Sequence, residues 1–142
     1  MAGYVFNSAP VIYAYTAADA LADGFLVSVP EVTAREAGFT IPVVMSRGAW
    51  DDCVTWDEGP EGNVDPAKPA TGQDEAGRLW DVLWLASQAA RRAAGDDMAV
   101  FDVLRVPAYG RGVTAKPVRL WATVGPGDDG SPLVTIMRPE DY

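Results

Sequence analysis

One segment constrains the fold more than any other: residues 74–94 carry apolar side chains at the spacing of an amphipathic helix. Asp74 stands at the start of this segment, where the helix dipole favours an anion, and Gly95 follows it at a position typical of a helix end. We expect Leu83 and Trp84 to lie in or against the core. The apolar positions that follow the helical period are Ala76, Leu79, Trp80, Leu83, Ala86, Ala90 and Ala93.

The last third of the chain predicts three strands. Val100–Val106, Val118–Val124 and Leu133–Arg138 are rich in β-branched residues and are separated by turn-forming residues. The glycines, prolines and aspartates of residues 125–132 predict a hairpin turn between the last two strands. These three segments together predict a β-meander.

Shorter elements precede the long helix. The segments Thr16–Asp19 and Thr33–Glu36 have the spacing of a capping box, and Ser46 heads a third short helix. Phe25–Val29 indicates a strand that ends at a proline. The sequence therefore predicts an α+β fold, in which a small antiparallel sheet packs against one long helix and short helices lie near the N-terminus.

The segment 57–73 differs in composition from its surroundings. It holds three prolines and three glycines and shows neither a helical nor a strand period. We expect a mobile surface loop here, within a single domain that spans residues 1–142. A chain of 142 residues suits one domain and leaves little room for two.

The composition excludes several classes of function. The chain has no histidine and one cysteine, which excludes Ser-His-Asp and Cys-His nucleophilic sites, histidine-ligated zinc and internal disulfides. A net charge of −9 argues against direct nucleic-acid binding. No apolar run is long enough to cross a bilayer and the N-terminus does not resemble a secretory signal, so we expect a cytoplasmic protein without metal or cofactor.

The negative charge is concentrated in one half of the sequence. Residues 1–75 hold three basic and twelve acidic residues, whereas residues 76–142 hold eight of each. Two adjacent acidic pairs, Asp51-Asp52 and Asp57-Glu58, predict a protein-binding surface for a basic partner. The alternatives are a solvated surface that keeps the chain soluble, and paired carboxylates that act in catalysis.

A second set of residues predicts a different kind of site. Arginines and aromatic rings together favour the capture of an anionic nucleotide. Alternatively, Arg78 forms an ion-pair chain with Asp74 and Asp81 along the flank of the helix. Cys53 is predicted to be a small buried residue whose thiol pKa is raised by its acidic neighbours. The residues of the predicted nucleotide site are Arg35, Arg78, Tyr13, Tyr15 and Trp80.

Several segments carry a resemblance to a known family: Ile12–Thr16, Ala20–Gly24, Ala34–Phe39 with Pro42 and Val43, Gln73–Trp84, Gly125–Gly130, Thr135–Met137 and Pro139–Asp141. They resemble a family of small acidic proteins of unknown function that phages, plasmids and other bacterial mobile elements encode. The resemblance covers most of the chain outside residues 57–73 and 107–116, and it carries over no catalytic residues.

The resemblance implies a functional context, because accessory proteins of mobile elements often counter host defences or redirect host enzymes. We therefore expect a non-enzymatic binding protein that inhibits or redirects a host or defence protein through an acidic face. The alternatives are a binder of an anionic nucleotide, and an enzyme that uses carboxylates or tyrosine.

Overall fold

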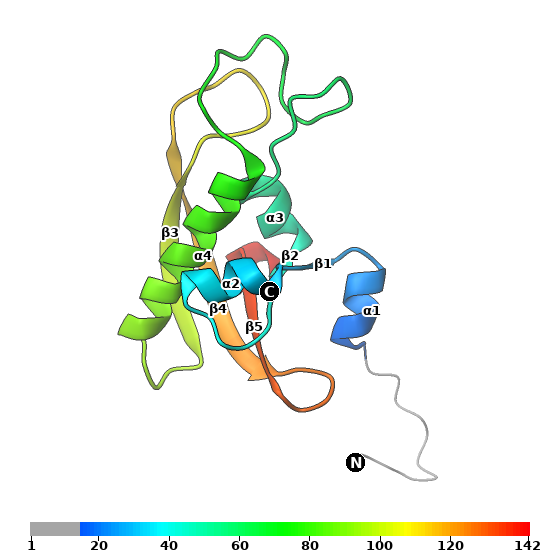
Figure 1. Ribbon diagram of the computed structural model, residues 1–142, viewed down its shortest axis with the longest axis vertical. Helices are drawn as coiled ribbons and strands as arrows, with labels where there is room; N and C mark the ends of the chain where they lie inside the picture. Colours follow the sequence, from blue (N-terminus) through cyan, green and yellow to red (C-terminus); the bar gives the residue numbers. More distant parts are fainter. Residues whose placement is uncertain (1–14) are drawn as a thin grey trace.

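The computed structural model describes residues 15–142, which form an α+β fold around one five-stranded sheet with the strand order β1-β2-β5-β4-β3 (Figure 1). This confirms the predicted fold class. The elements in chain order are α1 (Ala17–Ala22), β1 (Leu26–Ser28), α2 (Glu31–Ala37), β2 (Val43–Ser46), α3 (Arg47–Cys53), α4 (Glu75–Arg92), β3 (Met98–Arg105), β4 (Lys116–Pro126), β5 (Pro132–Met137) and the 3₁₀ turn η1 (Pro139–Asp141).

The predicted β-meander is confirmed. Strands β3, β4 and β5 pair antiparallel in chain order, with Phe101 opposite Leu120 and Ala122 opposite Ile136. Burial alternates along β3, as expected for a strand that buries one face. The buried side chains of these strands form one wall of the hydrophobic core.

Two further strands extend the sheet: β1, which confirms the strand predicted at Phe25–Val29, and β2, which the sequence does not predict. Strand β2 runs parallel to β5, with Val44 opposite Thr135, and β1 pairs antiparallel with β2. All four residues of β2 are buried, so this strand has no alternation of apolar and polar residues by which to recognise it. The sheet is therefore mixed, with its one parallel pair in the middle.

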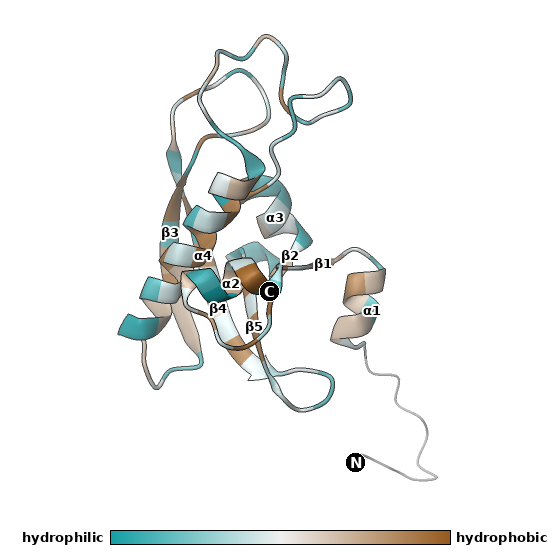
Figure 2. Ribbon diagram, in the orientation of Figure 1, coloured by the Kyte–Doolittle hydropathy of each residue, from teal (hydrophilic) through white to brown (hydrophobic). Residues whose placement is uncertain are grey.

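Helix α4 packs against β3 and β4 and supplies much of the core (Figure 1). Both of its ends are hydrophilic (Figure 2), because it starts with Glu75 and ends with two arginines. Leu83 is fully buried, as predicted. The hydrophobic residues of α4 that belong to the core are Leu79, Val82, Leu83, Ala86 and Ala89.

The prediction that Trp84 lies against the core is wrong. Trp84 is 45% exposed, and its ring stacks on that of Trp80, which lies one turn earlier, with the ring centroids 6.0 Å apart. The apolar arc of α4 is wider than the stripe that the sheet can cover, and Trp80 and Trp84 lie beyond the edge of that stripe. Ala76, which also follows the helical period, is exposed as well.

Two of the helix N-caps predicted from the sequence are present in the structure. The Thr16 side chain accepts a hydrogen bond from the backbone N–H of Asp19, and the capping box at α1 is complete. Ser46 accepts from the N–H of Ala49 at the start of α3. Both of these predictions are confirmed, and each cap satisfies an N–H group that has no partner within its helix.

The predicted capping box at Thr33 is wrong. Helix α2 begins at Glu31, directly after Pro30, and no side chain caps it. The fixed φ of proline already suits a helix start, so the helix forms two residues before the threonine. Its predicted end is confirmed, because Gly38 terminates α2 with a φ of +112°.

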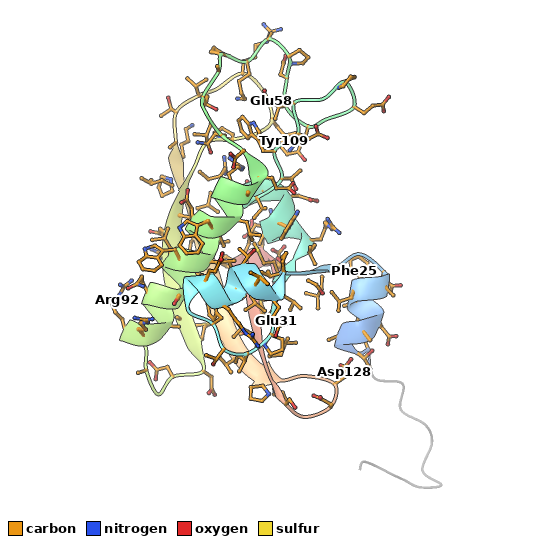
Figure 3. All side chains as sticks on the ribbon, viewed as in Figure 1. Phe25, Glu31, Glu58, Arg92, Tyr109 and Asp128 are labelled. Atoms are coloured by element: carbon orange, nitrogen blue, oxygen red, sulfur yellow. The ribbon has the colours of Figure 1, made fainter. Side chains whose placement is uncertain are left out.

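The predicted hairpin between β4 and β5 is confirmed, and it also holds α1 in place. The carboxylate of Asp128 accepts hydrogen bonds from the backbone N–H groups of Ala17 and Ala18, at 2.8 and 2.9 Å. Figure 3 shows Asp128 in the hairpin beside α1. The helix dipole favours an anion at the start of α1, so the hairpin, which is distant in sequence, anchors this helix.

Within residues 15–142, no helix has the length and apolarity needed to cross a membrane.

Candidate functional site

Two long loops pack together at the end of the molecule where α4 begins (Figure 1). We call them the loop lobe: residues 54–74, which join α3 to α4, and residues 106–115, which join β3 to β4. The ammonium of Lys68 donates a hydrogen bond to the carbonyl of Gly112, and Arg111 forms an ion pair with Asp65 at 3.3 Å. A small apolar cluster lies between the loops and consists of Trp56, Val64 and Ala108, with Val106 packed against them.

The buried guanidinium of Arg78 ties the loop lobe to α4. Arg78 is only 4% exposed and donates hydrogen bonds to the carbonyls of Val54 and Asp52, each at 3.2 Å, and of Val106 at 2.7 Å. Its guanidinium carbon lies 4.9 Å from the centroid of the Trp56 ring, in cation–π contact. One side chain therefore binds the end of α3 and both loops.

The predicted ion-pair chain along the flank of α4 is wrong. Asp74 instead caps the helix by accepting a hydrogen bond from the N–H of Gly77 at 2.6 Å, and Arg78 points into the core side of the helix. Burial lowers the pKa of Arg78, but a guanidinium remains charged in proteins. The partners of this charge are backbone carbonyl oxygens, whereas the sequence predicts the carboxylates of Asp74 and Asp81.

Several carboxylates of the loop lobe and the adjoining start of α4 have no basic partner in residues 15–142. Asp57 accepts a hydrogen bond from the N–H of Gly59 at 2.9 Å, and Glu58 accepts one from the indole N–H of Trp56 at 2.7 Å. These contacts fix the side chains but leave their negative charge unneutralised. Figure 3 shows Glu58 and Tyr109 within the loop lobe. The carboxylates without an ion pair are Asp57, Glu58, Glu61, Asp74 and Glu75.

The other acidic pair of the predicted protein-binding set has a different environment. Asp51 and Asp52 lie on α3, and both face arginines: Asp52 pairs with Arg105 at 3.0 Å, and Asp51 with Arg47 at 3.7 Å. The four predicted residues therefore divide into two with arginine partners and two without. A basic partner would have to displace an internal arginine to reach Asp52, whereas Asp57 and Glu58 are exposed.

The arginines of the predicted nucleotide site have separate contacts. Arg35 is exposed on α2 and pairs with Glu31 at 2.9 Å, one turn earlier. Arg78 is buried at the start of α4 and is bound to backbone carbonyls. Arg35 and Arg78 contact different residues. The guanidinium of Arg78 is thus occupied by the protein itself.

The aromatic residues of that predicted site are also distributed over the surface. Tyr15 is exposed, and its hydroxyl donates a hydrogen bond to Asp23 at 2.6 Å, beside the ring of Phe25. Trp80 stacks on Trp84 on the exposed side of α4. Tyr13 lies outside the described residues. The ring in contact with the Arg78 guanidinium is that of Trp56, which the sequence does not assign to the predicted site.

Cys53 lies in the core at the end of α3, as predicted for a small buried residue. Burial, and after it the charge of Asp52, raises the pKa of its thiol to about 12. We expect the folded protein to react very slowly with a thiol-specific reagent at mildly alkaline pH, because the reactive thiolate is scarce and the sulfur is covered. Reaction of the native protein as fast as that of the urea-unfolded protein, followed by absorbance, would contradict this assignment.

The loop lobe also predicts where proteases act first. Trp56, Val64 and Lys68 are buried anchors, and the backbone between the first two is exposed around Glu61. Limited digestion with a glutamate-specific protease should first cut within residues 57–73, after Glu61, as mass spectrometry of the fragments would show. A first cut after Glu75, inside α4, would contradict the assignment of the helix.

The sequence does not predict the buried side chains that anchor the loop lobe. Trp56, Val64 and Lys68 are buried although the segment reads as a polar loop. The available signal is the pair of apolar residues at 56 and 64 within a proline- and glycine-rich stretch. Lys68 offers no signal, because its carbonyl partner lies 44 residues away in sequence.

Among residues 15–142, no group of three or more histidine, cysteine, aspartate or glutamate side chains is placed so that it could hold a metal ion. The family model described as a family of unknown function, DUF6573, matches residues 1–142. The chain belongs to the DUF6573 family. No curated protein and no solved structure is significantly similar to it. The family confirms the expectation of a domain of unknown function and assigns no activity to any residue.

Proposed function

We propose that this DUF6573 protein is a non-enzymatic binding protein that docks on a basic protein surface through the carboxylates of the loop lobe. One observation carries the proposal: five carboxylates gather at one end of the molecule without arginine or lysine partners in the described chain. Elsewhere on the same half of the sequence, Glu31, Asp51 and Asp52 are paired with arginines. Carboxylates without an ion pair also occur on α2, after α4 and in the β4–β5 hairpin, so what distinguishes the loop lobe is that five of them lie at one end of the molecule.

The framework of the lobe supports this role. Arg78 and Trp56 hold the two loops against α4, and Trp56 also orients the carboxylate of Glu58. A preformed surface loses less conformational entropy on binding than a disordered acidic tail of the same charge. A negative surface of this kind accelerates the encounter with a positively charged partner.

The resemblance to proteins of phages and plasmids supports a more specific proposal for the partner. We propose that the partner is a host or defence protein whose basic surface serves another purpose, such as contact with nucleic acid. Occupation of that surface by the loop lobe would inhibit or redirect the partner. The negative charge of the chain, −9, matches such a target better than it matches nucleic acid itself.

The proposal is tested with two variants of equal charge. Each replaces four exposed carboxylates by amides and changes the net charge from −9 to −5. An immobilised arginine-rich peptide serves as the basic probe, and association is followed by interferometry at several salt concentrations. The lobe variant carries Asp57→Asn, Glu58→Gln, Glu61→Gln and Glu75→Gln. The control variant carries Glu36→Gln, Asp96→Asn, Asp97→Asn and Asp129→Asn.

We expect the lobe variant to bind the peptide about tenfold more weakly, mainly through a slower association rate, since each exposed charge contributes about 0–1 kcal/mol. The control variant should change the affinity by less than about twofold, and added salt should weaken binding of the unmodified protein. Equal weakening by the two variants would show that net charge alone attracts the peptide, and would overturn the proposal.

A further inference from the structure

The sheet has an exposed face whose composition differs from that of an ordinary solvated face. We call it the outer face: the side chains of β3, β4 and β5 that point away from α4. Alternate residues of these strands enter the core, among them Phe101, Leu120 and Ile136. Residues one position away must point to the opposite side. The residues of the outer face are Met98, Val100, Asp102, Leu104, Arg119, Trp121, Thr123, Leu133, Thr135 and Met137.

Strand pairing brings the apolar members of the outer face into one continuous surface. Val100 lies opposite Trp121, and Trp121 lies opposite Met137, so an apolar row crosses three strands. Met98 and Leu104 extend it along β3, and Leu104 is 71% exposed. Antiparallel sheets that face water on one side usually present polar residues there. This face is mostly apolar.

The described helices leave this face open over β3. Helix α4 packs on the core side of β3 and β4, and α1 contacts β1 at the far edge of the sheet. The ring of Tyr142, after η1, meets Trp121 edge to face at 5.6 Å. Val100 and Leu104 remain exposed. The apolar surface of β3 therefore has no cover within residues 15–142.

The charges of the outer face identify the kind of partner. Asp102 and Arg119 lie opposite each other and form an ion pair at 3.0 Å, and the hydrogen bonds from Arg119 lower the pKa of Asp102. They are the charged residues of this face, so its net charge is zero in a chain of −9. A basic partner gains no attraction here, whereas two copies of the chain can meet here without the repulsion that opposes them at the acidic lobe.

We propose that the outer face binds the outer face of a second copy, so that two sheets pack face to face about a twofold axis. In such an interface one patch must complement itself. Here each copy offers one aspartate, one arginine and an apolar row, so Asp102 of each copy faces Arg119 of the other while Val100 and Leu104 are removed from water. This assembly is independent of the lobe carboxylates and of their proposed partner.

The test is the mass of the full chain in solution, measured by light scattering and sedimentation equilibrium over low- to high-micromolar concentrations. We expect a species of twice the 15.1 kDa chain mass that dissociates on dilution. Leu104→Glu should weaken the dimer at least about tenfold, since it places a charge on the apolar surface that the contact removes from water. The matched control is Val32→Glu, because Val32 on α2 is 70% exposed and lies outside the outer face.

A charge exchange tests the geometry of the contact. Asp102→Arg alone should weaken the dimer, and addition of Arg119→Asp should restore it, because the double variant regains complementary pairs between the copies. Circular dichroism checks that each variant is folded. A wild-type protein that stays monomeric at the highest concentration would overturn the proposal. A dimer that Leu104→Glu and Val32→Glu affect equally would overturn it as well.

Discussion

Replacement of Arg78 by methionine is expected to lower the free energy of unfolding by about 3–5 kcal/mol. The substitution keeps most of the aliphatic volume but removes the donors that serve the carbonyls of Val54, Asp52 and Val106. Buried carbonyls without partners are costly, and the loss falls where two loops meet the helix. Urea unfolding followed by circular dichroism measures the effect.

The matched control for this prediction is Arg92→Met at the exposed end of α4 (Figure 3), which should change stability by less than about 1 kcal/mol. Arg78→Lys should recover only part of the loss, because one ammonium group lacks the planar fork that reaches several carbonyls. If Arg78→Met lowered the free energy of unfolding by less than about 0.5 kcal/mol, the stability of the lobe would not depend on the guanidinium.

The second large effect is expected at Leu83, where Leu83→Ala should cost about 2–5 kcal/mol of stability. Leu83 is fully buried between α4 and the sheet, and the truncation leaves a cavity that the surrounding side chains can fill only in part. Thermal and urea unfolding measure the loss. The size of the loss within this range depends on how far the core relaxes.

Trp84→Ala is the control for the core substitution. Trp84 is larger than Leu83 but stands on the exposed side of α4 and loses mainly its stacking on Trp80, so its removal should cost about 1 kcal/mol. A greater loss for Trp84→Ala than for Leu83→Ala would show that the helix is rotated relative to the face described above.

The elements with strong local patterns are predictable from the sequence. The period of residues 74–94 locates α4, the β-branched runs locate β3, β4 and β5, and Thr16 and Ser46 locate two helix starts. Each of these signals depends on residues that are close in sequence. The same local reasoning places Trp84 in the core, because a period cannot reveal how wide a stripe the sheet covers.

Contacts between distant residues account for the rest. Strand β2 joins the sheet through β5, about 90 residues later, and no local pattern indicates a parallel partner. In the candidate site, which acidic residues form ion pairs depends on which of them the fold brings close to an arginine. Arg105 reaches Asp52 from β3, whereas no basic side chain of the described chain pairs with Asp57 or Glu58. Composition predicts an acidic half, and only the tertiary structure shows which of its charges are unpaired.

If the loop lobe is the docking surface, as we propose, a bound basic probe slows hydrogen exchange there, and mass spectrometry locates the protected segments. The protein is labelled with and without a saturating arginine-rich peptide. We predict slower exchange in residues 54–74 and 106–115, and unchanged exchange at the far end of α4 around Gly95. Protection confined to other segments, with the loop lobe exchanging as in the free protein, would show that the lobe is not the docking surface.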